Sequence, residues 1–352
     1  MADLMNYLKF AVERDASDVL IVAGGPVYAK IEGHIHPADE IRMLPPQTEE
    51  LIREIYRIAE RPMDHYLETW DDDFSFSVPG LARFRVNAYR QRGSMAAVIR
   101  VVAFDIPDWQ TLRIPQQVMD LADVDHGMVL VTGTAGSGKS TTQACIIDRI
   151  NRTRDRHIIT LEDPIEYLHR NKCSIVSQRE IAIDTADYLA ALRACLRQAP
   201  DVILLGEMRD AETIRTAMTA AETGHTVIAT LHTKGTANSI DRIIDAFPSE
   251  QQTQVRVQLS MVLRTVVSQQ LVQDEKGGQV PAFEIMHMNG ATRSLIRDGK
   301  THQLTAAMAA AGEEGMVTMD QSLLALYKAG RISRETALSN ADNLEQMQRR
   351  LG

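Results

Sequence analysis

The sequence predicts a two-domain protein of the α/β class, with a small mixed α+β domain followed by a larger domain built on a mainly parallel sheet. The chain has 352 residues, and single hydrophobic cores seldom grow beyond about 250–300 residues. Apolar residues make up 44% and charged residues 24% of the chain, an ordinary composition for folded domains. From Gln116 onward, short apolar runs alternate with helical stretches, a pattern typical of a parallel sheet covered on both faces.

The first domain is expected over residues 1–103 as a mixture of helix and strand. A helix is predicted over 5–12 from its apolar spacing. Short strands are predicted around 19–22 and 27–31, where β-branched residues cluster. Further strands are expected at 74–78, 82–89 and 95–102.

The segment between the predicted strands at 27–31 and 74–78 carries a proline pair and a glutamate pair. We expect Pro45-Pro46 to break the chain. Thr48 would then cap a helix that continues through Ala59. Glu49 and Glu50 would lie in its first turn, where the helix dipole favours negative charge.

A proline-bounded linker over 104–115 is expected to lead into the second domain at 116–275. Buried strands are predicted at 127–132, 157–161, 202–205 and 226–231, and helices at 139–150, 185–197 and 211–223. After Gln273 the chain turns polar, and we expect a helical C-terminal region over 276–352.

The charge and cysteine content limits the possible partners. The formal net charge is −9, whereas nucleic-acid binders usually present a basic face. Cys145, Cys173 and Cys195 are widely spaced and odd in number, which fits a reducing cytoplasm better than a disulfide scaffold. No run approaches the roughly 20 apolar residues that cross a bilayer. We therefore expect a cytoplasmic protein with no membrane insertion and no nucleic-acid partner.

The most specific motif is a glycine-rich loop between a predicted strand and a predicted helix. It reads Gly133, Thr134, Ala135, Gly136, Ser137, Gly138, Lys139, Ser140, which fits the pattern GxxxxGK[ST]. Such a loop turns backbone N–H groups toward phosphates, and the following helix adds its positive end. Lys139 can reach the outer phosphates and Ser140 can ligate Mg²⁺. The loop predicts a nucleotide-phosphate site.

Acidic residues and histidines follow the other predicted strands of this domain. Glu207 ends the run that begins at Val202, as a Walker B acid does, and could hold Mg²⁺ directly or through water. Glu162 and Glu166 follow the strand at 157–161, and either could orient the attacking water. His232 follows the strand at 226–231 and could contact phosphate. These residues favour nucleotide hydrolysis.

Four motifs in this order resemble those of the secretion-ATPase superfamily and, within it, the type IV pilus retraction (twitching motility) ATPases. They are the loop at 133–140, the acidic segment at 160–166, the segment at 206–210 and the histidine segments at 223–225 and 230–233. The likeness extends to 73–76 and 83–88 in the first domain and to 291–297 in the tail. It covers nearly the whole chain.

The resemblance implies a PAS-like N-terminal domain, a RecA-like P-loop ATPase domain and a homohexameric ring that converts ATP hydrolysis into pilus retraction. ATP with Mg²⁺ would be held by residues of the loop and the next position, Thr141. Glu166 matches the acid usually regarded as the base, Glu207 the Walker B acid and His232 the phosphate-proximal histidine. Arg85 and Arg100 match arginines of the first domain that reach the nucleotide. If their strands pair, the two guanidiniums would share one patch.

The resemblance also implies partners and a location. The ring would dock peripherally at the inner face of the cytoplasmic membrane, on an inner-membrane pilus platform protein, and could work with an accessory retraction ATPase. Several positions depart from the family pattern: Thr134-Ala135 in the loop, Lys234 and Gly235 after the histidine segment, and Thr292 and Ser294 in the tail motif.

Three alternatives remain open at this point. A pilus-assembly or type II secretion ATPase, or an accessory retraction motor, would share the same chemistry. Many assembly members carry a four-cysteine zinc module, and this chain has no cysteine after Cys195. A RecA-like DNA translocase is opposed by the net charge and by the lack of a basic, aromatic-rich stretch. A scaffold that binds ATP without hydrolysing it is opposed by the intact acids.

Overall fold

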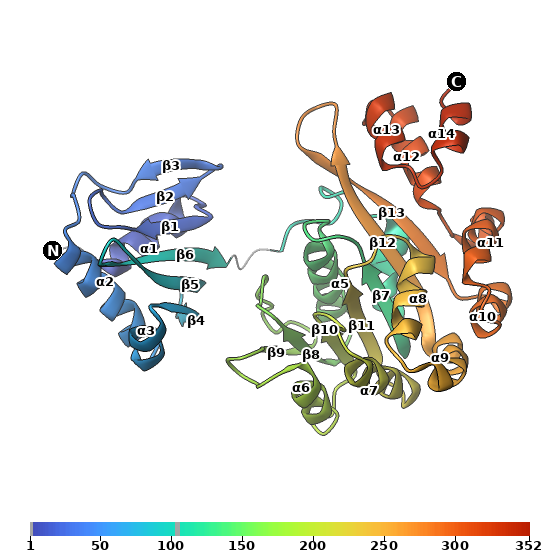
Figure 1. Cartoon of the computed structure of the whole chain (residues 1–352), viewed down its shortest axis with the longest axis horizontal. Helices are drawn as coiled ribbons and strands as arrows, with labels where there is room; N and C mark the ends of the chain where they lie inside the picture. The colour runs from blue at the N-terminus through green and yellow to red at the C-terminus, as the bar shows by residue number, and fades with distance from the viewer. Residues whose placement is uncertain (1–2, 103–105) are drawn as a thin grey trace. The chain divides into compact units, whose positions relative to one another are not determined.

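The computed structural model describes residues 3–102 and 106–352, with the side chain of residue 313 left out. The chain divides into two compact units. One consists of the residues before the linker together with 166–168, and the other of the remaining residues. Each unit has its own sheet and its own hydrophobic core (Figure 1).

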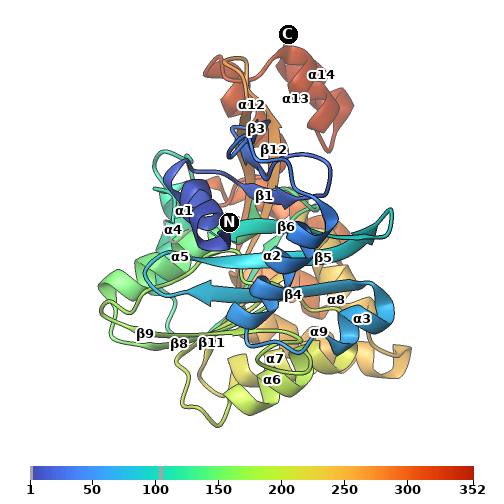
Figure 2. The ribbon, with the colours of Figure 1, turned by 90° about the vertical axis from the view of Figure 1, so that its left-hand side faces the viewer.

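The first unit is a six-stranded antiparallel sheet with helices packed on one face. The strand order is β3-β2-β1-β6-β5-β4. Helices α1 and α2 lie over the same face of the sheet (Figure 2). They share a core with the buried alternate residues of β1, β5 and β6. Because side chains alternate across a strand, the polar residues between these apolar positions face the other side of the sheet. The elements are α1 (Leu4–Glu13), β1 (Asp18–Ile21), β2 (Tyr28–Ile31), β3 (His34–Pro37), α2 (Pro45–Ile58), α3 (Asp64–Thr69), β4 (Asp71–Val78), β5 (Ala82–Gln91) and β6 (Ser94–Val102).

The start of α2 differs from the sequence prediction. Pro45 and Pro46 do not break the chain but form the first turn of the helix, and Leu44 is its N-cap. Proline fits there because the first N–H groups of a helix have no partner within it. The side chain of Gln47 accepts a hydrogen bond from the Leu44 N–H at 2.8 Å. Thr48, the expected cap, is buried inside the helix and bonds back to Pro45 O.

The second unit contains a seven-stranded sheet in the order β13-β12-β7-β11-β10-β8-β9. Every neighbouring pair is parallel except β12 with β13. The expected mainly parallel sheet is therefore confirmed. Its strands are β7 (Gly127–Thr132), β8 (His157–Glu162), β9 (Ile175–Glu180), β10 (Val202–Leu205), β11 (Thr226–Leu231), β12 (Leu263–Gln273) and β13 (Gln279–His287).

Helices cover both faces of this sheet, as expected for strands that are buried throughout. One face packs against α4 and α5, and the other packs against α6 to α11. The helices are α4 (Gln116–Met119), α5 (Lys139–Thr153), α6 (Tyr188–Cys195), α7 (Ala211–Glu222), α8 (Thr236–Asp245), α9 (Ser249–Val262), α10 (Gly290–Arg297), α11 (Leu304–Ala310), α12 (Met319–Lys328), α13 (Arg334–Asn340) and α14 (Leu344–Arg350).

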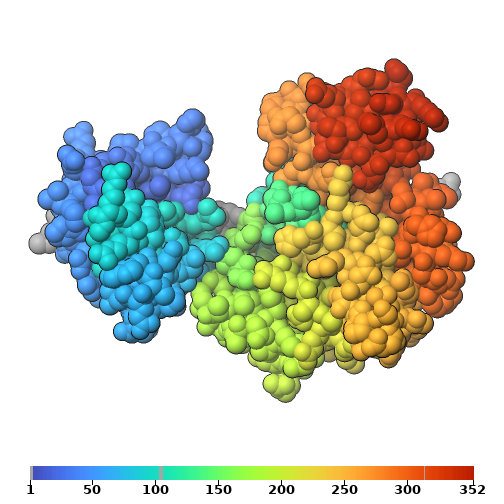
Figure 3. Space-filling model, in the orientation of Figure 1, coloured from blue at the N-terminus to red at the C-terminus, as the bar shows by residue number. Residues whose placement is uncertain are grey.

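The chain after Gln273 is not wholly helical as the sequence pattern suggested. Strand β13 pairs with β12 over nine residues, and the two form a hairpin at the edge of the sheet. Val272 and Val280 near the tip of the hairpin form a small core with α12, α13 and α14. In the space-filling view the C-terminal residues, in red, lie against the orange hairpin (Figure 3). The C-terminal helices are thus built onto the hairpin.

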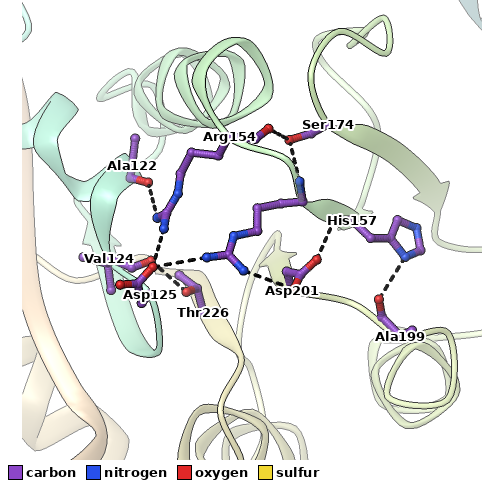
Figure 4. Close-up of polar contacts among 10 residues, drawn as sticks. Ala122, Val124, Asp125, Arg154, His157, Ser174, Ala199, Asp201 and Thr226 are labelled. Atoms are coloured by element: carbon purple, nitrogen blue, oxygen red, sulfur yellow. Dashed lines mark hydrogen bonds and ion pairs between the residues drawn. The ribbon is translucent and has the colours of Figure 1, made fainter.

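A polar network joins the starting ends of three strands of this sheet, β7, β8 and β10. Asp125, before β7, forms ion pairs with Arg154 and Arg156, which precede β8 (Figure 4). Arg156 also pairs with Asp201, which precedes β10. The Asp201 carboxylate accepts the N–H of His157 at 2.8 Å. This network lies at the end of the parallel strands opposite to the phosphate loop, so it serves the sheet rather than the nucleotide.

Candidate nucleotide-binding site

The phosphate loop connects the end of β7 to the start of α5, the setting the sequence predicted. Gly133, Gly136 and Gly138 have φ values of 148°, 75° and 86°, which glycine adopts without strain. A Cβ at Gly133 would lie 2.4 Å from the Gln269 carbonyl oxygen and 2.5 Å from Ser137 Oγ. This glycine is therefore required by close packing as well as by its backbone angle.

The loop leaves donors free for an anionic ligand. Among the described residues, no acceptor bonds the backbone N–H groups of Ala135, Gly136 or Gly138. Ser137 Oγ is buried and likewise has no partner in the described chain. Unpaired buried polar groups are rare and usually mark a site for water or ligand. The loop fits the phosphates of a nucleotide.

Lys139 is the first residue of α5 and is almost completely buried. Its Nζ donates to the carbonyl oxygens of Gly133 and Thr134, each at 2.9 Å. The ammonium group is thus held directly over the loop. Ser140 and Thr141 follow in the first turn of the helix and are half-buried.

Gln269 on β12 is a supporting residue that the sequence reasoning missed. Its Oε1 accepts a hydrogen bond from Thr142 Oγ1 at 2.7 Å, and both side chains are buried. Its Nε2 lies where a Cβ on Gly138 would come within 2.8 Å. Gln269 therefore packs on both ends of the loop. A run of three polar residues, 268–270, inside an otherwise apolar strand was the signal available.

Glu207 and His232 are brought together by the parallel pairing of β10 and β11. Each residue lies just beyond the carboxyl end of its strand. His232 Nε2 is 3.2 Å from Glu207 Oε2, and the other carboxylate oxygen pairs with Arg209. The Glu207 side chain is 12% exposed and that of His232 is 55% exposed. The carboxylate is therefore held while the imidazole remains accessible.

The candidate groups form an ordered row at the carboxyl edge of the sheet. The strand order β7-β11-β10-β8 places the phosphate loop, His232, Glu207 and Glu162 in sequence along this edge. Glu162 Oε1 accepts hydrogen bonds from Thr160 Oγ1 at 2.6 Å and from Gln178 Nε2 at 3.2 Å. It is thus fixed at the end of β8.

Glu166 lies in the loop after β8. Its side chain is exposed, and no hydrogen bond or ion pair joins it to another described residue. The structure therefore pairs Glu207 with His232 but shows no contact that brings Glu166 to them.

Arg85 and Arg100 lie directly opposite each other on the antiparallel strands β5 and β6 of the first unit. The expected pairing of these strands is confirmed. Arg100 is also opposite Asp18 on β1, and its Nε donates to Asp18 Oδ1 at 3.0 Å. Asp18, which sequence reasoning did not single out, is buried and also accepts from Ser17 Oγ. It orients the Arg100 side chain across the pair of strands β1 and β6.

A cavity of about 410 Å³ adjoins the phosphate loop within the second unit. It shares Gly138, Thr141 and Thr142 with the loop and its helix. Leu112, Ile114, Leu271, Val280 and Pro281 provide apolar walls, and Asp274, Gln279 and Arg331 add polar groups. Apolar walls with a few polar groups are typical of small-molecule pockets. The cavity has the place and character of a nucleoside pocket.

No cluster of three or more histidine, cysteine, aspartate or glutamate side chains suited to a metal ion occurs in the described part of the chain. A divalent ion here would depend on Ser140, Glu207 and the phosphates of the nucleotide itself. In residues 3–102 and 106–352, no helix combines the length and apolar character needed to cross a bilayer.

The fold and the site define a P-loop nucleotide-hydrolase core joined to a smaller α+β unit. Residues 2–347 match the family model described as type II/IV secretion system protein, and the chain belongs to this family. The resemblance to its ATPases, inferred from the motifs, is confirmed, and so is the expected fold class.

Several relatives are similar over nearly the whole chain. The type IV pilus retractation ATPase PilT of Pseudomonas aeruginosa is 44% identical over 344 residues, covering 96% of this chain and 98% of that protein. The type IV pilus ATPase PilU of the same organism is 39% identical, covering 96% and 88%. A crystal structure of the pilus retraction motor PilT with bound ADP has 43% identity and a TM-score of 0.90, covering 99% of this chain and all of that one.

Proposed function

We propose that this chain is the ATP-hydrolysing motor of type IV pilus retraction, the machinery of twitching motility. The observation that carries the proposal is the row formed by the phosphate loop, His232, Glu207 and Glu162 along one sheet edge. A phosphate grip with fixed acids beside it is the arrangement that phosphoryl transfer requires. Similarity to retraction motors over nearly the full length supports the same conclusion.

ATP is the nucleotide in this proposal. Its phosphates bind the free N–H groups of the loop, with Ser137 Oγ and Lys139 Nζ as further donors. The nucleoside part of ATP extends past Thr141 into the adjoining cavity. Ser140 and Glu207 would hold Mg²⁺, Glu207 directly or through water, and the ion would supply charge neutralisation at the outer phosphates.

The acids and the histidine divide the chemistry between them. His232 is accessible and touches Glu207, so it can report on the γ-phosphate to the Walker B acid. Glu166 is exposed and unconstrained by neighbours, as suits a residue that orients water only when nucleotide is bound. Glu207 is the alternative base, and Glu162 supports this edge of the sheet through its two hydrogen bonds.

Arg85 and Arg100 supply positive charge to the transferred phosphoryl group. Arginines in this role neutralise charge that develops in the transition state and contribute about 10³–10⁵ in rate. Supplied by a separate unit, they would also link nucleotide state to domain movement, since ATP would favour closure and hydrolysis would release it.

The working form is a homohexamer docked at the inner face of the cytoplasmic membrane. It acts on an inner-membrane pilus platform protein, with an accessory retraction ATPase as a further partner. The alternatives, a pilus-assembly ATPase or a type II secretion ATPase, would use the same chemistry to extend a filament rather than to retract it.

Deletion of the gene in its host separates retraction from assembly. Cells that lack a retraction motor should carry pili and fail to twitch, and the wild-type gene should restore twitching. Glu207→Gln should not restore it, because the acid is needed for turnover. Bald cells after deletion would identify an assembly motor instead.

A further inference from the structure

The cavity beside the phosphate loop contains a charged group from the far end of the chain. Arg331 lies between α12 and α13, yet it lines the cavity together with Thr141 and Thr142 of the loop helix. The cavity is therefore lined by the loop helix, the segment 111–114, the β12–β13 hairpin and the C-terminal helical region.

The Arg331 side chain is held in a defined position. Its guanidinium forms a two-point ion pair with Asp274 at the tip of the hairpin, through Nε at 3.3 Å and through Nη2. The side chains of Arg331 and Asp274 are 16% and 6% exposed. The backbone of the next residue adds a further link, because the Glu275 N–H donates to Arg331 O at 2.7 Å.

The ion pair leaves part of the guanidinium available. Among the described residues, no acceptor bonds Nη1 of Arg331, whereas Nε and Nη2 are occupied by Asp274. A guanidinium fixed at one edge offers its flat face to an aromatic ring and its free N–H groups to ring nitrogens. Leu271 and Pro281 supply apolar surface in the same cavity.

From this geometry we infer that Arg331, positioned by Asp274, binds the nucleobase of ATP and makes the C-terminal helical region part of the nucleotide site. The inference rests on the proposed function, since it requires that the phosphates occupy the loop. Residues 318–351 share a hydrophobic core with Val272 and Val280 of the β12–β13 hairpin. Because the hairpin lines the pocket, these residues are packed directly onto the nucleotide site. When the nucleotide dissociates, the C-terminal helical region loses the contact between Arg331 and the nucleobase.

The test compares a ligand that has a base with one that has none. ADP occupies the loop and the cavity, whereas tripolyphosphate occupies the loop alone. Calorimetric titration of the full chain, with Mg²⁺ present, measures both dissociation constants. Arg331→Ala should weaken ADP roughly ten-fold and leave tripolyphosphate unchanged.

Arg331→Lys keeps the charge opposite Asp274 but lacks the planar face, so it should fold normally and still weaken ADP several-fold. Arg334→Ala is the matched control, because Arg334 is exposed in the same region and does not line this cavity. The thermal midpoint of each variant reports whether it is folded.

The outcomes separate the contact from a structural role. Unchanged ADP binding in both folded Arg331 variants would overturn the inference. Equal loss of ADP and tripolyphosphate would also overturn it, since the pair would then support the whole site rather than the base. Wild-type chain that binds neither ligand would defeat the proposed function, and the inference with it.

Discussion

At the scale of single residues, Glu207 is a candidate catalytic acid whose carboxylate is held at both oxygens. It is nearly buried, and both its carboxylate oxygens contact cationic or titratable groups, Arg209 and His232. Such contacts fix the orientation of a carboxylate before substrate arrives, which is the basis of electrostatic preorganisation. Glu162 is similarly fixed, whereas Glu166 is not.

Glu207→Gln should therefore lower kcat by at least about 100-fold and leave the dissociation constant for ADP within a few-fold of wild type. The amide keeps the shape of the side chain but removes its charge. Phosphate release and equilibrium binding measure the two quantities. Glu212→Gln, which alters an exposed acid paired with Arg193, should change neither.

Near wild-type turnover in Glu207→Gln would show that this acid has been wrongly assigned. The same measurement on Glu166→Gln assigns the base. Loss in both variants fits a Walker B acid and a separate water-orienting acid, and loss in Glu207→Gln alone would make Glu207 the base.

His169 gives the stability of the loop after β8 a dependence on pH. Burial lowers its pKa to about 4, with Asp148 opposing and Lys172 reinforcing the shift. In the unfolded chain histidine titrates near 6.5, so below that pH the unfolded state binds more protons. The free energy of unfolding should therefore decrease as the pH falls from 6.5 toward 4, by at most about 3 kcal/mol.

His169→Gln should remove this part of the pH dependence. Denaturant unfolding of both proteins at pH 7, 6, 5 and 4.5 measures it as the difference between their free energies of unfolding. Parallel curves over this range would show that the imidazole stays protonatable in the folded state.

Some site residues follow local sequence motifs, whereas others depend on partners far away in the chain and could not be predicted from the sequence. The loop motif and the acids after each strand follow local patterns, and the structure places the loop, Glu207 and His232 at one edge. Gln269 and Asp18 depend on partners 127 and 82 residues away in the chain. No local pattern signals such a pairing.

At the scale of elements, strands with strong apolar runs were predicted and less regular ones were missed. β7, β10 and β11 are buried at every position, so their continuous apolar runs predict them. β9 and the end of β12 are partly exposed and carry polar residues such as Gln178 and Gln273, and tertiary pairing decides their conformation. The start of α2 was misjudged because a proline pair can begin a helix as well as stop a chain.

The link between α5 and β12 should be measurable as stability. Thr142→Val removes the donor to Gln269 and leaves its Oε1 buried without a partner, which should cost about 1–3 kcal/mol. Thr153→Val in the same helix removes only a bond to Arg149 O at an exposed position, so it should cost about 0.5 kcal/mol or less. Urea unfolding of the two variants compares them. Equal midpoints for both would refute a special role for this contact.

At the scale of the whole molecule, the family match extends over residues 2–347, so it includes both units and the C-terminal helices. The mainly parallel sheet was expected from the alternation of strands and helices. The joining of α12 to α14 with the β12–β13 hairpin was not, because it depends on a small core formed by residues far apart in sequence.

Assembly is a property of the whole chain. We expect a hexamer in the presence of ATP and Mg²⁺, six times the chain mass of 39.2 kDa. Light scattering after size-exclusion chromatography measures that mass directly. A monodisperse monomer at micromolar concentration with saturating ATP would contradict the proposed ring.

The central claim is that the loop at 133–140 and the acids beside it hydrolyse ATP. Its most direct test is steady-state phosphate release by the purified full chain and by Lys139→Ala, in which the ammonium held over the loop is removed. The account predicts turnover in the wild type and its loss in the variant. Turnover that is no higher in the wild type than in Lys139→Ala would contradict it.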